Sequence, residues 1–363
     1  MIAILLGAVS PLVTAAMAQG ASVAGPSGQA ISASDVTADV TGSGSVGIEA
    51  SIYPGTSGQA TCDAPAEVGA MPQGSLAVVK PQYLTVGNDG RVTVVSARQM
   101  PCNGYRPAAL RQLQSSAKQV FVTVSAGPTP TAAALATPTA MSAAQQAITS
   151  FVSQNRLQGA ELDFQPTGWS QDLWSSYMTF VSGLSASLGA AGGTLEVDLP
   201  GWTSTPPDAE RYADPVAAGA KLVVMALDHQ YVQACSPIAP YSWLRSVVEY
   251  AESQVAASSL VVGIPSYGYI ARSCSSITAV RDNVPYVSMQ VQPGFPSSPP
   301  DVAAHRDPAS GEIRWREGQT QYDYVDSIAM RSKLRLIQGL GVTEVSVWSL
   351  GGNPWFTGDP GAS

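Results

Sequence analysis

The sequence contains 363 residues, of which 45% are hydrophobic and only 12% charged, and it includes 34 Gly and 27 Pro. This composition predicts a loop-rich globular fold and argues against a disordered chain. The net charge of -8 and the pI near 4.7 argue against nucleic acids and anionic membrane surfaces as partners.

The first 20 residues form an apolar run that ends in Ala16-Met17-Ala18, a pattern typical of a signal-peptide cleavage site. No Lys or Arg precedes the run, so a membrane anchor or a misassigned start is the alternative. Pro11 interrupts the run, and the run is short for a membrane span. We therefore expect a signal peptide at 1–18, a flexible Ala/Ser/Gly-rich linker at 19–45, and a secreted, periplasmic or cell-envelope location.

The four cysteines of an exported chain indicate two disulfides, and the sequence leaves three pairings open. The two histidines, His229 and His305, are interpreted as surface or loop residues. Because no C-x-x-C or His-rich spacing occurs, the sequence predicts neither a metal site nor a cofactor.

Eight short β-prone runs alternate mostly with helical patterns, such as the one over Ser142–Asn155. This alternation predicts either a (β/α)8 barrel or a doubly wound parallel sheet. The runs are Val46–Tyr53, Leu76–Val86, Gln119–Ser125, Gly159–Phe164, Thr194–Leu199, Lys221–Leu227, Leu260–Pro265 and Glu344–Trp348.

The fourth run contains polar residues at alternate positions. Glu161, Asp163 and Gln165 leave one face of a strand, while Leu162 and Phe164 leave the other. The faces of a parallel α/β sheet are normally dry, so three stacked polar side chains predict the mouth of a site.

The segment Gln158–Pro166 resembles the Asp-Gly-x-Asp-x-Asp-x-Glu motif on the fourth barrel strand of family-18 glycoside hydrolases, the chitinase family. Gly159 and Asp163 match the motif. Gln158 and Glu161 stand in place of its first and second Asp, and Gln165 stands in place of the catalytic Glu.

Other segments resemble the family in the family's own order. They are Phe121–Gly127 for the third strand, Val223–Asp228 for the sixth, Val262–Tyr269 for the seventh and Val345–Gly352 for the eighth. The resemblance covers nearly the whole exported chain and implies a chitinase-like (β/α)8 TIM barrel over 46–363.

The seventh and eighth barrel strands are separated by a Pro-, Ser- and Gly-rich stretch, and no clear helix appears at 54–75. The resemblance implies a small α+β insertion at 271–320, in which Tyr286–Met289 and Glu312–Trp315 are expected to be short strands. The run from Gly311 to Gly352 is similar to the branch that contains bacterial spore-cortex and peptidoglycan glycosidases.

Hydrolysis in this family is substrate-assisted and requires a protonated acid beside the glycosidic oxygen. The amide of Gln165 has no proton to give, and general-acid help is worth about 10²- to 10⁴-fold in rate. Leu227 also stands where the family has a Tyr that holds the substrate acetamide. We therefore expect a secreted glycan-binding protein that does not hydrolyse its ligand.

Two alternatives remain open. The first is an active glycosidase on chitin, peptidoglycan or another polysaccharide, with Asp198 as the substitute acid. The second is a structural role with a vestigial cleft. Glu161 is expected in a buried carboxylate network with Asp163, and Glu196 in a salt bridge with Lys80 or Lys221.

The ligand implied by the resemblance is an oligo- or polysaccharide, with N-acetylglucosamine as one candidate unit. Trp348 is expected to stack on a sugar ring, Asp228 and Tyr267 to supply polar contacts, and Trp202 and Tyr231 to flank the rim. Trp174 and Trp243 lie in helical patterns, where an apolar stripe is the simpler interpretation. In such a barrel the top loops meet, which pairs Cys62 with Cys102 and Cys235 with Cys274.

Overall fold

The computed structural model describes residues 46–55, 62, 64–275 and 280–356; of Arg281 and Asp282 only the backbone is described. The predicted signal peptide and linker lie outside these residues. Within the described part of the chain, no helix is both long and apolar enough to cross a bilayer.

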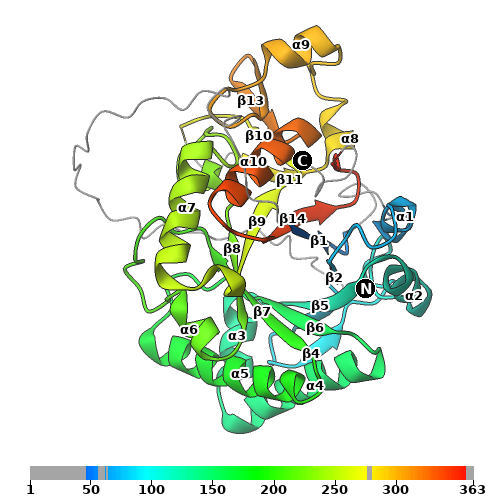
Figure 1. Cartoon of the computed structure of the whole chain (residues 1–363), viewed down its shortest axis with the longest axis vertical. Helices are drawn as coiled ribbons and strands as arrows, with labels where there is room; N and C mark the ends of the chain where they lie inside the picture. The colour runs from blue at the N-terminus through cyan, green and yellow to red at the C-terminus, as the bar shows by residue number, and fades with distance from the viewer. Residues whose placement is uncertain (1–45, 56–61, 63, 276–279, 357–363) are drawn as a thin grey trace, which may run out of the picture. The chain divides into compact units, whose positions relative to one another are not determined.

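Eight parallel strands close into a barrel (Figure 1). Each strand pairs with the next in the chain, and the circle closes between the last and the first. This confirms the predicted (β/α)8 architecture. The strands are β1 (Gly47–Ile52), β2 (Val78–Pro81), β5 (Gln119–Ser125), β6 (Gly159–Asp163), β7 (Thr194–Pro200), β8 (Lys221–Met225), β9 (Leu260–Pro265) and β14 (Glu344–Leu350).

The second predicted run is divided in two. After β2 the chain bends and continues as β3 (Leu84–Val86), which pairs in parallel with β5 and antiparallel with β4 (Val92–Val94). The bend lies directly after Pro81, whose missing N–H cannot extend a ladder.

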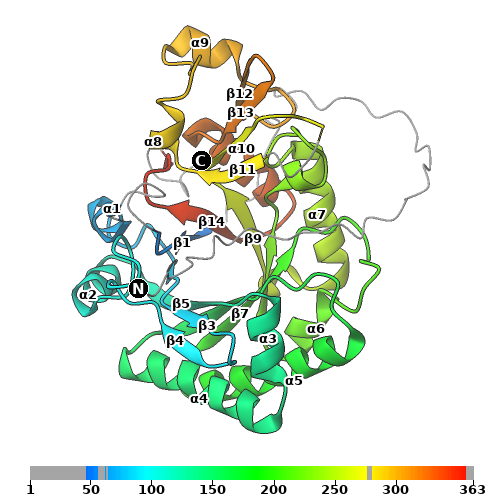
Figure 2. The same ribbon diagram turned by 180° about the vertical axis from the view of Figure 1, so that it is seen from behind.

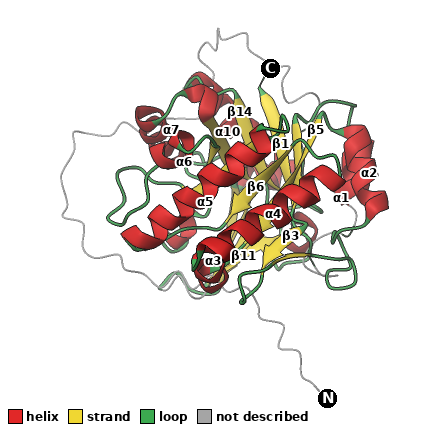
Figure 3. Ribbon diagram, turned by 90° about the horizontal axis from the view of Figure 1, so that it is seen from below, coloured by secondary structure: helices red, strands yellow, loops and turns green. Residues whose placement is uncertain are grey.

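Helices lie outside the barrel, where α4 and α5 run side by side (Figure 3). Side-chain caps fix where several of them begin: Thr137 accepts from Ala140 N at the start of α4, and Ser170 accepts from Leu173 N at the start of α5. The helices are α1 (Ala64–Ala70), α2 (Pro107–Ser116), α3 (Pro128–Leu135), α4 (Pro138–Gln154), α5 (Gln171–Gly189), α6 (Ala213–Ala217), α7 (Tyr241–Gln254) and α10 (Ser327–Gly339). The region predicted to lack a first helix therefore contains the short α1.

The predicted insertion is a four-stranded antiparallel sheet in the order β11-β10-β13-β12 (Figure 2). It spans 268–324, slightly more than the predicted 271–320, and carries two short helices. Its elements are β10 (Gly268–Ala271), β11 (Val280–Val284), α8 (Tyr286–Met289), α9 (Pro299–Ala304), β12 (Ile313–Glu317) and β13 (Thr320–Tyr324).

One strand prediction in the insertion was wrong. Tyr286–Met289 forms α8, because Pro285 occupies the position before the first turn and four residues are too few for a β pattern to decide. The expected strand at Glu312–Trp315 is present as β12. The ring of Trp315 on β12 stacks on Tyr322 of β13 at 4.8 Å and 8°, within a small core of the insertion's own.

Both predicted disulfides are present. Cys62–Cys102 joins the segment after β1 to the segment before α2. Cys235–Cys274 joins the loop after β8 to the loop after β10, and so connects the barrel to the insertion.

Candidate functional site

The barrel interior holds a group of charged side chains, which we call the barrel cluster: Glu49, Lys80, Glu161, Asp163, Glu196 and Asp198. Lys80 Nζ lies 2.8 Å from Glu49 Oε2, 2.5 Å from Glu161 Oε1 and 3.0 Å from Glu196 Oε2. Lys80 is on β2, whereas Glu161 and Glu196 are on β6 and β7, which do not neighbour β2. These contacts therefore cross the inside of the barrel, where large aliphatic side chains are usual.

The structure confirms the predicted pairing of Glu196 with Lys80. Lys221 instead pairs with Glu344 at the amino-terminal end of the barrel, where both side chains are about one-third exposed. Thr123 Oγ1 also donates to Glu161 Oε2 at 2.6 Å. Glu161 is thus held by an ammonium and a hydroxyl.

Asp163 and Asp198 lie two residues nearer the carboxyl ends of their strands than Glu161 and Glu196. Both are buried, at 7% and 6% exposure, and the Oδ1 of each lacks a hydrogen-bond partner among the described residues. Burial, together with the nearby Glu161, raises the pKa of Asp163 to about 6. Burial and the neighbouring Glu161 and Asp163 raise the pKa of Asp198 well above its usual range.

Lower in the cluster, burial and Glu49 raise the pKa of Glu196 to about 8. Burial alone would lower the pKa of Lys80, but Glu161, Glu196 and Glu49 outweigh it and raise that pKa well above its ordinary value. The Lys80 ammonium therefore stays charged at neutral pH.

Gln165 lies just beyond the end of β6, in left-handed backbone at φ 46°, and its side chain is exposed. A hydrogen bond from Gln165 to the Asp163 carboxyl opposes the rise in the Asp163 pKa. The intervening Phe164 leaves by the other face and packs on Tyr177 and Phe180 of α5, at ring distances of 5.5 and 6.2 Å. Polar and apolar side chains therefore leave opposite faces of β6 and its extension, as their alternation in the sequence predicts.

Two predicted polar residues meet at the ends of β8 and β9. The hydroxyl of Tyr267 donates to Asp228 Oδ1, which also accepts from Gln230 Nε2 at 3.0 Å. Asp228 has left-handed backbone, at φ 66°, three residues after the end of β8. Tyr231 closes the 3-10 turn His229–Tyr231 that follows.

Aromatic side chains lie at the ends of β14 and β7. Trp348 is partly exposed, its ring lies 6.3 Å from that of Tyr53, and its Nε1 donates to Asn283 Oδ1 at 2.9 Å. Trp202 stacks on Tyr212 at 4.9 Å and 26°. Tyr53 and Asn283 were not singled out from the sequence; Tyr53 ends the first β-prone run, but nothing in the sequence marks Asn283.

The other two tryptophans differ from each other. Trp174 is fully buried in the aromatic packing of α5, as its helical pattern predicts. Trp243 on α7 is only half-buried and, with His229, lines a cavity of about 510 Å³. No group of three or more His, Cys, Asp or Glu suited to a metal ion occurs among the residues that the structure describes.

Known structures share this architecture at low sequence identity. The chitinase from Chromobacterium violaceum is 19% identical, with a TM-score of 0.65 over 85% of this chain and 95% of that one. A class V chitinase from Pseudomonas fluorescens is 19% identical, with a TM-score of 0.66 over 87% and 98%. The spore cortex-lytic enzyme SleL from Bacillus megaterium is 16% identical, with a TM-score of 0.61 over 85% and 71%.

No protein-family model matches the sequence, and no curated protein matches it. At these identities the likeness establishes a chitinase-type TIM barrel and leaves activity to be argued from the residues themselves.

Proposed function

We propose that this protein binds an oligo- or polysaccharide at the carboxyl end of the barrel and does not cleave it. The observation that carries the proposal is the exposed amide of Gln165 at the end of β6, directly above a buried acidic cluster. This is the position where the chitinase-type motif supplies its acid. A primary amide gives no proton to a leaving sugar, so bond cleavage lacks its general acid.

Several groups at the same end of the barrel suit a saccharide. The partly exposed indole of Trp348 offers an apolar face to a pyranose ring, and Trp202 and Tyr231 extend the aromatic surface. Asp228 and Tyr267 form a hydrogen-bonded pair that can accept and donate to sugar hydroxyls. Neither this recognition nor its ligand requires a cofactor.

The solved chitinases and the cortex-lytic enzyme of like fold make chitin-type and peptidoglycan glycans the first ligands to test, including those that contain N-acetylglucosamine. Two disulfides fit an oxidising compartment, which supports secretion or residence in the periplasm or cell envelope.

A second candidate is a glycosidase that uses Asp198 as its acid. The observation in its favour is the raised pKa of Asp198 beside Asp163, whose pKa is about 6, because two carboxyls with separated pKa values are typical of acid–base pairs. Against it, Asp198 is buried inside the barrel, whereas Gln165 is the exposed group.

Reducing-end release from chitin oligosaccharides and peptidoglycan fragments separates the two candidates. The binding proposal expects no turnover by the wild type or Asp198→Asn, and turnover only in Gln165→Glu, with Leu227→Tyr added where the single change is too weak. Turnover by the wild type that disappears in Asp198→Asn would establish the second candidate.

Calorimetry with the same sugars tests binding itself. We expect heat with the wild type and at least a tenfold weaker affinity in Trp348→Ala, because the stacking surface is removed. No detectable heat at about millimolar sugar, the weak limit for a specific site, would leave only a structural role for the barrel.

A further inference from the structure

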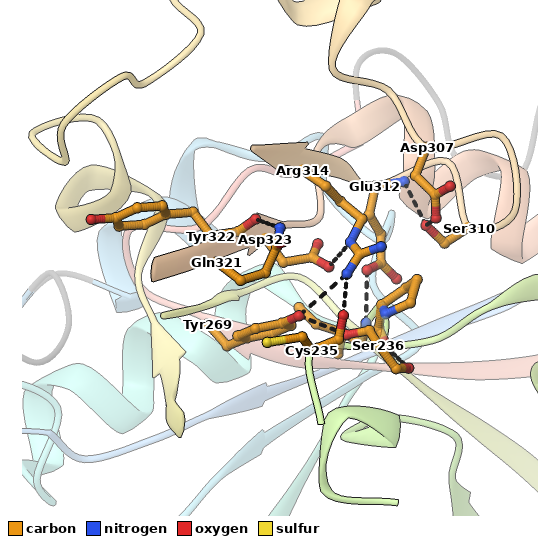
Figure 4. A network of polar contacts seen from close by, with 12 residues as sticks. Cys235, Ser236, Tyr269, Asp307, Ser310, Glu312, Arg314, Gln321, Tyr322 and Asp323 are labelled. Atoms are coloured by element: carbon orange, nitrogen blue, oxygen red, sulfur yellow. Dashed lines mark hydrogen bonds and ion pairs between the residues drawn. The ribbon is translucent and has the colours of Figure 1, made fainter. Parts of the chain in front are cut away.

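The loop between β8 and α7 contains the short 3-10 turn His229–Tyr231, and several residues after this turn are held by hydrogen bonds. Ser236 O accepts from Tyr269 Oη at 2.7 Å, and Cys235 O accepts from Arg314. The backbone N–H groups of Ile238 and Ala239 donate to Glu312 at 2.7 and 2.8 Å. Figure 4 shows Arg314 and Glu312 reaching from β12 and the residue before it to this loop.

A second set of contacts shapes the other side of the loop. His229 Nδ1 lies in hydrogen-bond contact with Ser236 Oγ, and Ser236 Oγ donates its proton to Pro237 O at 2.8 Å. A hydroxyl has one proton, so while Ser236 gives it to Pro237 O, the proton of the shared bond comes from His229 Nδ1. Burial lowers the pKa of His229, so the ring is neutral and its Nε2 is an acceptor.

This fixed loop, together with the first turns of α7, lines the cavity of about 510 Å³. Trp243 forms one wall, and its ring edge lies against Gly201, where a Cβ would approach within 3.2 Å of the indole. The ring of His229 lies 4.9 Å from that of Trp243. The remaining polar lining is mainly hydroxyl and amide groups, from Thr203, Gln233, Ser236, Ser242 and Ser246, with the Arg314 guanidinium at one side.

The chemistry of this lining selects a class of ligand. An indole wall, a neutral imidazole acceptor and several hydroxyls match an uncharged ring that has an apolar face and hydroxyl edges. Arg314 Nε donates to Asp323 Oδ2 at 2.7 Å and its Nη2 to Cys235 O, so at least two of its five N–H donors are occupied before any ligand arrives. A cavity whose walls are already held in place loses little conformational freedom on binding.

We propose that this cavity is a separate binding site for one neutral pyranose unit, stacked on Trp243 and donating a hydroxyl proton to His229 Nε2. The contacts of Glu312 and Arg314 are explained by their role in holding the insertion to the barrel, but that role does not require a partly exposed indole beside an acceptor. The site lies near the ends of β7 and β8 and uses none of the residues assigned to the rim. Either site can therefore fail while the other stands.

The indole N–H signals of ¹⁵N-labelled full-length protein test this proposal, with Trp243→Phe identifying the signal of Trp243. Glucose and N-acetylglucosamine are added separately up to about 100 mM, well above a millimolar dissociation constant. We expect a saturable shift of the Trp243 signal with at least one of them. The same shift should persist in Trp348→Ala, which alters only the rim site.

Ser246→Leu supplies the blocking variant, because Ser246 lines the cavity on an exposed face of α7 and Leu suits a helix. It should weaken the shift at least tenfold while leaving the other indole signals in place. Three results would overturn the proposal: no movement of the Trp243 signal, loss of the shift in Trp348→Ala, or movement with glucuronate alone, which would make Arg314 an anion site.

Discussion

Two groups of buried charge in this protein are built in different ways. In the barrel cluster, one ammonium faces five carboxyls. Where the insertion meets the barrel, two carboxyls, Glu312 and Asp323, face two cations, Arg314 and Lys333. We call this second group the junction network.

The junction network is also tied to backbone. Lys333 Nζ donates to Ala239 O at 2.6 Å and Ser310 O at 2.8 Å, while Glu312 accepts from Ile238 and Ala239. Burial would raise the pKa of Glu312, but Lys333 and these hydrogen bonds outweigh it and lower that pKa. Burial and Glu312 raise the pKa of Asp323, which Arg314 opposes. The contacts of the junction network therefore explain its role, which is to hold the insertion against the barrel.

No comparable account explains the barrel cluster. Three of its carboxyls meet Lys80, but Asp163 and Asp198 form no ion pair with it, and each leaves an oxygen without a partner among the described residues. Asp323 of the junction network also leaves one such oxygen, but its other oxygen is paired with Arg314. Unpaired buried carboxyls destabilise a fold, and they persist mainly where function requires them. The comparison therefore distinguishes the junction network, whose charges stabilise the fold, from Asp163 and Asp198, whose carboxyls the fold tolerates near the carboxyl ends of the barrel strands.

The largest effect is expected from Lys80→Met. It removes the only cation that contacts Glu49, Glu161 and Glu196 among the described residues, and breaking a buried ion pair from one side costs about 3–5 kcal/mol. Urea unfolding at pH 7 measures the loss.

The matched control is Lys221→Met, which removes the same kind of side chain from the partly exposed pair with Glu344. Solvent screens that pair, so the expected change is below about 1 kcal/mol. If Lys80→Met costs no more than this control, the barrel carboxyls are already neutral in the fold and the ammonium is not what holds them.

A somewhat smaller and more local effect is expected from Lys333→Met. It removes two hydrogen bonds to backbone carbonyls and the partner of Glu312, with a loss of about 3 kcal/mol. Hydrogen exchange should show the insertion at 268–324 and the start of α7 opening before the barrel strands, because the fastening lies between them.

Arg335→Met on the same helix is the control, since Arg335 is exposed and a surface change there is expected to stay within about 0.5 kcal/mol. Equal loss of protection in barrel and insertion would show that the network supports the whole fold and would remove the distinction between the two groups.

The barrel was predictable because its strands are short, mostly apolar and regularly spaced, and because β6 alternates polar with apolar residues. That alternation also placed Glu161 and Asp163 inside the barrel. The four-residue segment Tyr286–Met289 was too short for its pattern to outweigh the preceding proline. A periodic pattern therefore predicts a strand or helix only when it extends over more than a few residues.

Contacts between residues far apart in the sequence were harder to predict. Lys333 and Ala239 are 94 residues apart, and Trp348 and Asn283 are 65 apart. The first contact depends on how α10 packs on the loop before α7, and the second on how the insertion packs on the barrel. Local patterns do not encode that packing, and for the same reason the cavity beside Trp243 could not be inferred from its helical stripe.

The smallest effect, and the one of opposite sign, is expected from Asp163→Asn. The folded protein holds this carboxyl at a pKa of about 6, above its usual value, so the group favours the fold while protonated and opposes it once pH rises through 6. A shift of about 2 units corresponds to about 2–3 kcal/mol. The variant should therefore be more stable than the wild type by up to that amount at pH 8 and nearly equal to it near pH 4.

Urea unfolding across this pH range measures the difference, with Asp208→Asn in an exposed loop as the control that should show no such trend. A variant less stable than the wild type at pH 8 would mean that Lys80 compensates the Asp163 charge as fully as the junction network compensates its own. The carboxyls of the barrel cluster would then have a structural role, and Gln165 would lie above a cluster whose charges are compensated. A gain in stability instead marks Asp163 as a group kept for its ligand at the expense of the fold.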